Sequence, residues 1–401
     1  MRVSDRFLQY VRYASHSKHC ADPKEITIAK ALERELRTLG LSDVRCDENA
    51  YVYGFLPATP GYEDKPAIGF FAHTDTADDH PVDAVHPVLH PDYDGGDVTL
   101  TGRTLRVADF PHLKTLAGRT LITTDGTTLL GADDRAGAAE IVTMLETVLA
   151  ENIPHGRIAV CFTSDEEHGS EGLDGIDLRV FGCDYAFTVD GGAEGELEYE
   201  NFNAAGADFE ISGFNVHPGS SKDTMINAAL VAMEINAMLP SAETPRGTEG
   251  YEGFYHLCDM RGDVGHAKLS YIVRDHSAER FESRLNTLRH IEKATNERWG
   301  KGTAALTITQ QYRNMAEKIR PCFQIVELAE AAIRDAGLEP RVQPIRGGTD
   351  GAKLSYMGLP CPNLGTGGYA FHGPYEHCTV EGMEKAEKVL EYIVRRFVRQ
   401  P

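Results

Sequence analysis

The chain has 401 residues, of which 41% are hydrophobic and 25% are charged, so it is long and apolar enough for a large core and, we expect, two domains. Its formal net charge of −21 at pH 7 opposes binding to nucleic acid and to anionic membranes. No apolar run approaches the roughly 20 residues of a membrane span, and the first residues predict an amphipathic helix instead of a signal peptide, so we expect a cytoplasmic protein without a membrane partner.

The N-terminal region predicts two helices, because residues 4–14 and 22–39 carry apolar side chains at helical spacing. Asp22, which precedes a proline, is expected to cap the second helix. A β-strand is predicted over residues 52–56. Residues 76–121 are rich in Pro, Asp and His, and we expect a long loop there.

Three apolar runs are predicted to be buried strands of a parallel sheet, at residues 67–72, 158–162 and 185–189. Each run is followed by acidic or imidazole groups, which are His73 and Asp75, Glu166 and Glu167, and Asp190, respectively. Open α/β sheets place their ligands at the carboxyl ends of their strands. We therefore expect these groups to share one site.

Two more candidates for this site come from elsewhere in the chain. Asp133 lies at the start of a helix predicted over residues 131–149, where the helix dipole favours an anion. His372 lies in the glycine-containing loop 367–374. The candidate metal ligands are then His73, Asp133, Glu167, Asp190 and His372. An oxygen-rich set with two imidazoles is typical of a dinuclear hydrolase centre for Zn²⁺, Mn²⁺ or Co²⁺, in which Asp133 is our bridging candidate.

Each of these features has a simpler alternative when it is taken alone. An isolated Glu-Glu pair is more often an acidic surface turn, a lone histidine a satisfied polar residue, and an aspartate at a helix start only a cap. Their joint occurrence at strand ends favours a metal site, since neighbouring carboxylates such as Glu166 and Glu167 both stay ionised only beside strong positive charge. One glutamate can then bind metal while the other moves protons. Asp75, two residues after His73, is placed to orient the His73 imidazole from the side away from the metal.

The region from about residue 205 to 314 predicts a separate domain with the order β-α-β-α-β. Its predicted elements are strand 208–212, helix 223–239, strand 267–273, helix 277–299 and strand 304–312. Beyond it the α/β pattern resumes, with helices over residues 321–336 and 380–398. We therefore expect a mixed, largely parallel α/β sheet flanked by helices. The catalytic domain would comprise residues 1–204 and 315–401, and the inserted smaller α/β domain residues 205–314.

Two other classes of site find no support. The glycine-rich segment 346–351 lacks the spacing of a P-loop or of a dinucleotide fingerprint, so we expect no nucleotide role. The eight cysteines form neither a CxxC pair nor a compact framework, and we expect free thiols.

Several stretches resemble the M20-type family of dinuclear zinc aminopeptidases and carboxypeptidases. They run essentially from end to end of the chain, and they include HTDTAD (73–78), LITTDGTTLLGADDRAG (121–137), TSDEEHG (163–169), TVDGG (188–192), NVHPGSSK (215–222), IRGGTDGAKLSYMGLPCPNL (345–364) and YAFHGPYEH (369–377). Several of these are specific to the tripeptide aminopeptidases within the family.

The resemblance implies a ligand set. One metal would be held by His73, Asp133 and Asp190, and the other by Asp133, Glu167 and His372. These would be two Zn²⁺ ions per subunit, with Mn²⁺ or Co²⁺ as substitutes. Asp75 would support His73, and Glu166 would be the general base.

The resemblance also implies roles for the inserted domain. It would be a lid used for dimerisation in a homodimer, and His217 would reach toward a catalytic centre to stabilise the oxyanion. Arg274 and Arg346 are expected to contact the substrate carboxylate or the transition state. The imidazole of His168 is expected to face solvent or to support the ligands from outside, and not to be an extra metal ligand.

The function that we expect is release of the N-terminal residue from a tripeptide, with the acidic run Glu196-Glu198-Glu200 as a partner for the substrate ammonium. A related M20-type dipeptidase or N-acyl amino acid amidohydrolase is the alternative within enzymes, and the need for a free N-terminal ammonium separates it. A catalytically silent peptide-binding protein is the alternative outside enzymes. Such a protein would be expected to lose Glu166, which is present.

Overall fold

A computed structural model describes residues 1–13, 23–81, 84–167, 173 and 175–399. Asp22, predicted to be a helix cap, and His168, predicted to face solvent or to support the ligands without binding metal, lie outside these residues. The chain divides into two compact units, of which the first comprises Met1–Tyr199, Met315–Gln343 and Thr349–Pro401, and the second Glu200–Asn314 and Pro344–Gly348. In the described ranges, no helix combines the length and the apolar character that crossing a bilayer requires. Every described cysteine is a free thiol, as predicted.

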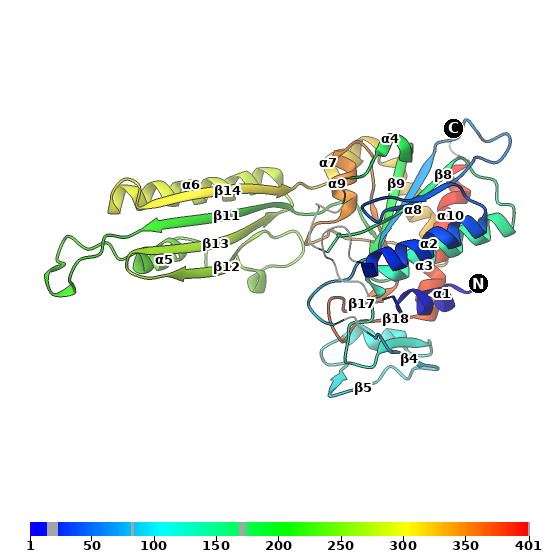
Figure 1. Ribbon diagram of the computed structural model, residues 1–401, viewed down its shortest axis with the longest axis horizontal. Helices are drawn as coiled ribbons and strands as arrows, with labels where there is room; N and C mark the ends of the chain where they lie inside the picture. The colour runs from blue at the N-terminus through cyan, green and yellow to red at the C-terminus, as the bar shows by residue number, and fades with distance from the viewer. Residues whose placement is uncertain (14–22, 82–83, 168–172, 174, 400–401) are drawn as a thin grey trace. The chain divides into compact units, whose positions relative to one another are not determined.

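The first unit is built around a mixed eight-stranded sheet with the order β1-β2-β8-β3-β9-β16-β10-β15 (Figure 1). Its strands are β1 (Ser42–Cys46), β2 (Val52–Leu56), β3 (Ile68–His73), β8 (Ile158–Thr163), β9 (Tyr185–Gly191), β10 (Glu196–Glu198), β15 (Arg341–Val342) and β16 (Asn363–Gly365). The three predicted buried strands are confirmed as β3, β8 and β9. They are parallel neighbours, with His73 opposite Thr163, so their carboxyl ends meet at one edge.

Helices cover both faces of this sheet, which explains why its central strands are apolar throughout. The helices are α1 (Val3–Tyr10), α2 (Pro23–Leu39), α3 (Ala132–Ala150), α4 (Leu178–Phe181), α7 (Ala316–Ile319), α8 (Gln324–Asp335), α9 (Asp350–Tyr356) and α10 (Val380–Phe397). Adjacent residues of β3 point to opposite faces. Phe70 stacks on Phe187, which contacts Phe397 of α10, whereas Phe71 packs on Phe181 of α4. The predicted class, an α/β sheet flanked by helices, is confirmed.

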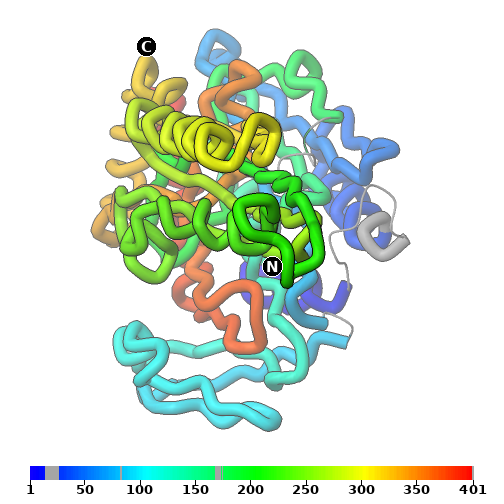
Figure 2. The backbone as a smooth tube through the Cα atoms, turned by 90° about the vertical axis from the view of Figure 1, so that its left-hand side faces the viewer, coloured from blue at the N-terminus to red at the C-terminus, as the bar shows by residue number. Residues whose placement is uncertain are grey.

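The long loop predicted for residues 76–121 is wrong, because this region contains short strands that pair with distant parts of the chain. It holds β4 (Pro87–His90), β5 (Val98–Leu100), β6 (Arg103–Leu105) and the 3₁₀ helix η1 (Pro111–Leu116). A second sheet of the same unit has the order β17-β18-β7-β4, where β7 is Leu121–Thr124, β17 Gly368–Tyr369 and β18 His377–Thr379. Figure 2 shows residues 85–125 in cyan beside the orange-red hairpin that carries β17 and β18.

The second unit is a four-stranded antiparallel sheet with the order β12-β13-β11-β14, packed against two helices (Figure 1). Its elements are β11 (Asn203–Ser212), α5 (Ala228–Ala237), β12 (Phe254–Gly262), β13 (His266–Asp275), α6 (Ala278–Trp299) and β14 (Ala304–Tyr312). Strand β12 was not predicted, since it is an edge strand with most side chains exposed. Helix α5 starts later than predicted, at a cap where the Asn227 side chain accepts a hydrogen bond from the Leu230 N–H.

Candidate metal centre

The strand ends of the first unit gather the acidic and imidazole groups that the sequence placed there. His73 is the last residue of β3, Asp190 is the next-to-last residue of β9, and Glu166 and Glu167 follow β8. Asp133 reaches them because the first turn of α3 approaches β9 closely. A Cβ atom at Gly137 would clash with the carbonyl oxygen of Val189, so only glycine permits this approach.

The carboxylate of Asp133 lies between two imidazoles. Its Oδ1 atom is 2.9 Å from Nε2 of His73, and its Oδ2 atom is 3.4 Å from Nε2 of His372. Nε2 of His73 is also 3.4 Å from Oδ1 of Asp190, and Nε2 of His372 is 3.1 Å from Oε2 of Glu167. Each imidazole thus shares Asp133 and has one further carboxylate of its own, which is the arrangement expected of a bridging ligand between two metals.

Asp75 fixes the first imidazole and the glutamate pair together. Its carboxylate is fully buried, with Oδ1 3.2 Å from Nδ1 of His73. The same carboxylate accepts hydrogen bonds from the backbone N–H groups of Glu166 and Glu167, at 3.3 and 3.1 Å. With Nδ1 engaged by Asp75, Nε2 of His73 is directed at the carboxylates, which is how outer carboxylates orient metal-binding histidines.

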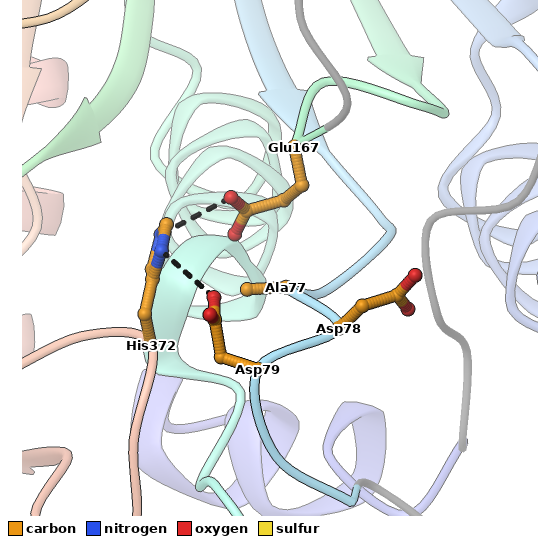
Figure 3. Close-up of a pocket in the computed structure, with 5 residues that line it drawn as sticks. All are labelled: Ala77, Asp78, Asp79, Glu167 and His372. Atoms are coloured by element: carbon orange, nitrogen blue, oxygen red, sulfur yellow. Dashed lines mark ion pairs between the residues drawn. The ribbon is translucent and has the colours of Figure 1, made fainter. Parts of the chain in front are cut away.

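His372 stands at the mouth of the site and is 48% exposed, whereas His73 is 2% exposed. It lines a cavity of about 260 Å³ together with Ala77, Asp78, Asp79 and Glu167. Figure 3 shows the ring between Glu167 and Asp79, with Nδ1 3.6 Å from Oδ2 of Asp79. The Glu167 and His372 side of the centre is therefore open to solvent.

The charges of the site are strongly coupled. Burial opposes protonation of His73, but the charges of Asp190 and Asp75 raise its pKa well above the usual range. Hydrogen bonds to Asp133 and Glu167 raise the pKa of His372 to about 11. Burial would raise the pKa of Asp133, yet its hydrogen bonds with His372 and His73 lower it instead. A cluster of carboxylates thus demands positive charge, which two divalent cations would supply.

The donor set fits such cations. Two groups of three residues have ligand atoms that all lie within 4.8 Å of one another. One group is His73, Asp133 and Glu167, and the other is His73, Glu166 and Asp190. Oε1 of Glu167 is buried and has no hydrogen-bond partner among the described residues, as expected of an oxygen that binds a cation in the loaded protein. Oxygen and imidazole donors suit Zn²⁺, Mn²⁺ or Co²⁺.

Glu166 lies inside this cluster, and its distance to the other donors is compatible with a ligand or with a base. Burial and the nearby charge of Asp190 raise the pKa of Glu166 well above its usual value. A carboxyl group with a raised pKa is suited to moving protons near neutrality.

Two buried carboxyl groups of the site were not predicted. Oδ2 of Asp134 accepts a hydrogen bond from the His73 N–H at 3.1 Å. Glu376 accepts three backbone N–H bonds from the turn that leads to Asp133. Glu376 lies only four residues after the predicted ligand His372. However, no periodicity or spacing in the sequence indicates that it contacts the turn before Asp133.

The remaining predicted residues belong to the second unit. His217 is exposed and caps the 3₁₀ turn Pro218–Ser220, where its Nδ1 accepts a hydrogen bond from the Gly219 N–H at 3.1 Å. Since Nδ1 is an acceptor, Nε2 carries the hydrogen and can act as a donor.

Arg274 and Arg346 are both engaged with backbone carbonyls of the second unit. Arg274 donates to the carbonyl groups of Ala205 and Val273. Arg346 donates to the carbonyl groups of Thr248, Gly250 and Glu252 and stacks on Phe202 and Phe254, which holds the loop 248–252 in place. Both Nη groups of Arg346 take part in these contacts, whereas Arg274 uses only Nη1.

Of the acidic run proposed for the substrate ammonium, Glu198 is buried and accepts a hydrogen bond from Nδ2 of Asn363 at 2.8 Å. Glu196 lies against Gly192, where a Cβ atom would be 2.5 Å from its Oε2. Glu196 therefore lies beside Gly192, which is two residues after Asp190, whereas Glu200 lies in the second unit.

Comparison with known proteins gives consistent results. The family model described as "Peptidase family M20/M25/M40" matches residues 130–396. The chain is 47% identical to Peptidase T of Alkaliphilus oremlandii, with 98% of each chain covered, and 48% identical to Peptidase T of Clostridium perfringens, with 100% of each covered. Identity to Peptidase T of Bacillus subtilis is 47%, with 99% of each covered.

Solved structures share the fold. The aminopeptidase PepT from Bacillus cereus superposes with a TM-score of 0.80 at 23% identity, covering 100% of this chain and 98% of that one. A tripeptidase from Staphylococcus aureus superposes with a TM-score of 0.81 at 23% identity, with the same coverage.

Proposed function

The chain belongs to peptidase family M20/M25/M40, and on this premise we propose that it is a metal-dependent aminopeptidase that releases the N-terminal residue from tripeptides. The resemblance drawn from the sequence motifs is thereby confirmed at the level of the family, as is the expectation of an enzyme. The observation that carries the proposal is the position of Asp133 between the imidazoles of His73 and His372, with Glu166 grouped with His73 and Asp190.

One metal would be held by His73, Asp133 and Asp190, and the other by Asp133, Glu167 and His372. When bound, two divalent cations would lower the pKa of a shared water to near 7 and polarise the scissile carbonyl group. Two Zn²⁺ ions per subunit fit the donors, with Mn²⁺ or Co²⁺ as substitutes. Asp75 holds the imidazole of His73 in place, and the close approach of α3 to β9 holds Asp133 in place.

Glu166 would take the proton from the attacking water and later deliver it to the leaving amine. Its raised pKa supports this role, because the protonated form must persist long enough to act as an acid. The oxyanion that forms on the carbonyl needs a hydrogen-bond donor, and Nε2–H of His217 is our candidate. Arg274 and Arg346 remain the proposed partners of the substrate carboxylate.

The names of the relatives support the substrate class. Peptidase T relatives match the whole chain, and one solved neighbour is called a tripeptidase. A peptide with two free ends brings one ammonium and one carboxylate, and a site that pairs both groups rejects peptides that lack either one. Glu196 is the proposed partner of the ammonium.

The test is a turnover assay of the metal-loaded protein on matched peptides of two, three and four residues, each free and N-acetylated. We expect the free tripeptide to be cleaved fastest, with release of its first residue, and the acetylated tripeptide to be cleaved at least about 100-fold more slowly. Preferred cleavage of dipeptides or of acetylated substrates would replace this proposal by the dipeptidase or amidohydrolase alternative.

We further propose that the enzyme is a homodimer and works in the cytoplasm. The second unit offers an edge strand, β12, and exposes Leu230 and Met233 of α5. An exposed sheet edge and exposed apolar side chains are features through which a twin copy can pair.

A further inference from the structure

The best-defined contact around the centre involves Glu376, which the proposed mechanism does not use. Glu376 is 1% exposed, and its Oε2 atom accepts hydrogen bonds from the Leu130 N–H at 2.7 Å and the Gly131 N–H at 2.9 Å. Its Oε1 atom accepts from the Asp133 N–H at 3.0 Å. Both oxygens are thus committed to one turn of backbone, and that turn ends at the bridging carboxylate.

This turn is one that needs an external partner. Gly131 has the left-handed φ of 78°, and Asp133 and Asp134 have non-helical backbone angles, so the N–H groups around the start of α3 find no partners within a regular helix. Leu130 and Gly131 are buried, where unpaired N–H groups are costly. The carboxylate of Glu376 satisfies three of these groups at once.

The segment that holds Glu376 also holds the proposed metal ligand His372. Glu376 lies in the segment between β17 and β18, four residues after His372. Its own N–H donates to the carbonyl group of Gly373, and the next residue, His377, enters β18 opposite Thr123 of β7. Glu376 is therefore anchored on both sides, and it links the placement of His372 to that of Asp133.

We propose that Glu376 is a positioning residue that places Asp133 and His372 as one unit and so sets the affinity of the second metal, whose ligands are Asp133, Glu167 and His372. This inference rests on the proposed function, because it uses the ligand set assigned there. Glu376 itself is not among the assigned ligands, because both of its oxygens accept hydrogen bonds from N–H groups of the turn. Substitutions behind metal ligands typically weaken metal binding by about 10–100-fold.

The conservative variant is Glu376→Gln. Its side chain has the same shape, but it has one acceptor oxygen, and its NH₂ group would face an N–H donor of the turn. At least one of the three hydrogen bonds is then lost. The matched control is Glu381→Gln in the first turn of α10, because Glu381 also accepts backbone bonds, from the Thr120 N–H at 2.9 and 3.1 Å, without contacting the turn before Asp133.

The experiment titrates Zn²⁺ into chelator-treated protein and measures the dissociation constants of the two sites by calorimetry. We expect Glu376→Gln to weaken the second site by about 10–100-fold and Glu381→Gln to leave both sites within about threefold of wild type. Circular dichroism and the unfolding midpoint of the metal-free proteins establish that both variants are folded at the temperature used. Excess Zn²⁺ should restore the kcat of Glu376→Gln on a tripeptide without a change in KM.

Equal metal affinities of wild type and Glu376→Gln would overturn the inference. An equal loss of affinity in Glu381→Gln would also overturn it, since the effect would then reflect general destabilisation. A wild-type protein that binds no metal would instead refute the proposed function, so the two failures are distinguishable.

Discussion

The imidazole of His73 and the carboxylate of Asp133 face each other at 2.9 Å, although 60 residues separate them in the chain. Asp133 makes a second such approach, to His372, so its removal should disturb both halves of the centre. We expect Asp133→Asn to lose most of both metals after dialysis, whereas Glu167→Gln should lose about one of two. Metal content per chain by mass spectrometry checks this. Equal losses in the two variants would contradict a bridging role for Asp133.

Glu166 is expected to move protons and not to hold metal. Glu166→Gln should therefore keep the metal content of wild type while kcat on a tripeptide falls by at least about 100-fold, the usual scale for a positioned acid and base. Metal analysis and kinetics on the same sample decide the matter. Because Glu166 lies within 4.8 Å of His73 and Asp190, a loss of metal from this variant would identify it as a ligand instead.

The parts of this site that the sequence predicted are those that a parallel sheet brings together. Apolar runs identified β3, β8 and β9, and because parallel neighbours end at one edge, their following residues had to meet. Asp133 was predicted from its place at a helix start and His372 from its place in the glycine-containing loop 367–374, whereas the division of the ligands between two metals came only from the family resemblance. The contact of Asp133 with Glu376 spans 243 residues and depends on how two irregular segments fold, which no local pattern reports.

The elements that the sequence did not predict are short or lie at edges. β4 and β7 are four residues each; they pair with one another, and β7 also pairs with β18, so neither strand shows a usable alternation by itself. β12 has the exposed pattern of an edge strand. These strands could not be predicted from local sequence, because they are stabilised by pairing with other strands and not by an apolar periodicity of their own.

Glu140 of α3 should make the protein less stable at alkaline pH. It is fully buried, neither carboxylate oxygen has a hydrogen-bond partner among the described residues, and burial together with the charge of Glu387 raises its pKa well above 4.5. The unfolded chain ionises near pH 4.5, so stability is fully present below that pH and is lost as pH rises toward the folded pKa. We expect Glu140→Gln to gain roughly 1–3 kcal/mol over wild type at pH 8 and little at pH 4.5.

Thermal unfolding of the metal-free proteins across pH measures this difference. Glu391→Gln of α10 is the matched control, because Glu391 is as buried as Glu140 but is paired with Lys388 and Arg395. It should lose stability at pH 8. A Glu140→Gln protein that is less stable than wild type at pH 8 would show that Glu140 has a stabilising partner.

His377 should produce a loss of stability at acidic pH. Its Nδ1 donates to the carbonyl oxygen of Tyr375 at 2.7 Å, so its Nε2 accepts from Nε2 of His112 at 2.9 Å, and burial lowers its pKa to about 4. The unfolded imidazole binds a proton near pH 6.5. Stability is therefore full above about pH 6.5 and declines as pH falls toward 4. His377→Gln should flatten this part of the unfolding profile, and an unchanged slope between pH 6.5 and 4 would assign the acid sensitivity to other groups.

The last prediction concerns His217 and the proposed homodimer. If His217 serves the catalytic centre of the partner subunit, His217→Ala and Glu166→Gln proteins are each nearly inactive, because every centre in either dimer lacks one part. Mixing them under conditions that exchange subunits produces heterodimers in which one centre lacks both parts and the other has both. About half of the dimers are then mixed and each has one intact centre of two, so activity should recover toward about a quarter of wild type. Subunit exchange is verified with two affinity tags. Its occurrence without recovery of activity would show that His217 acts within its own chain or has no part in the reaction.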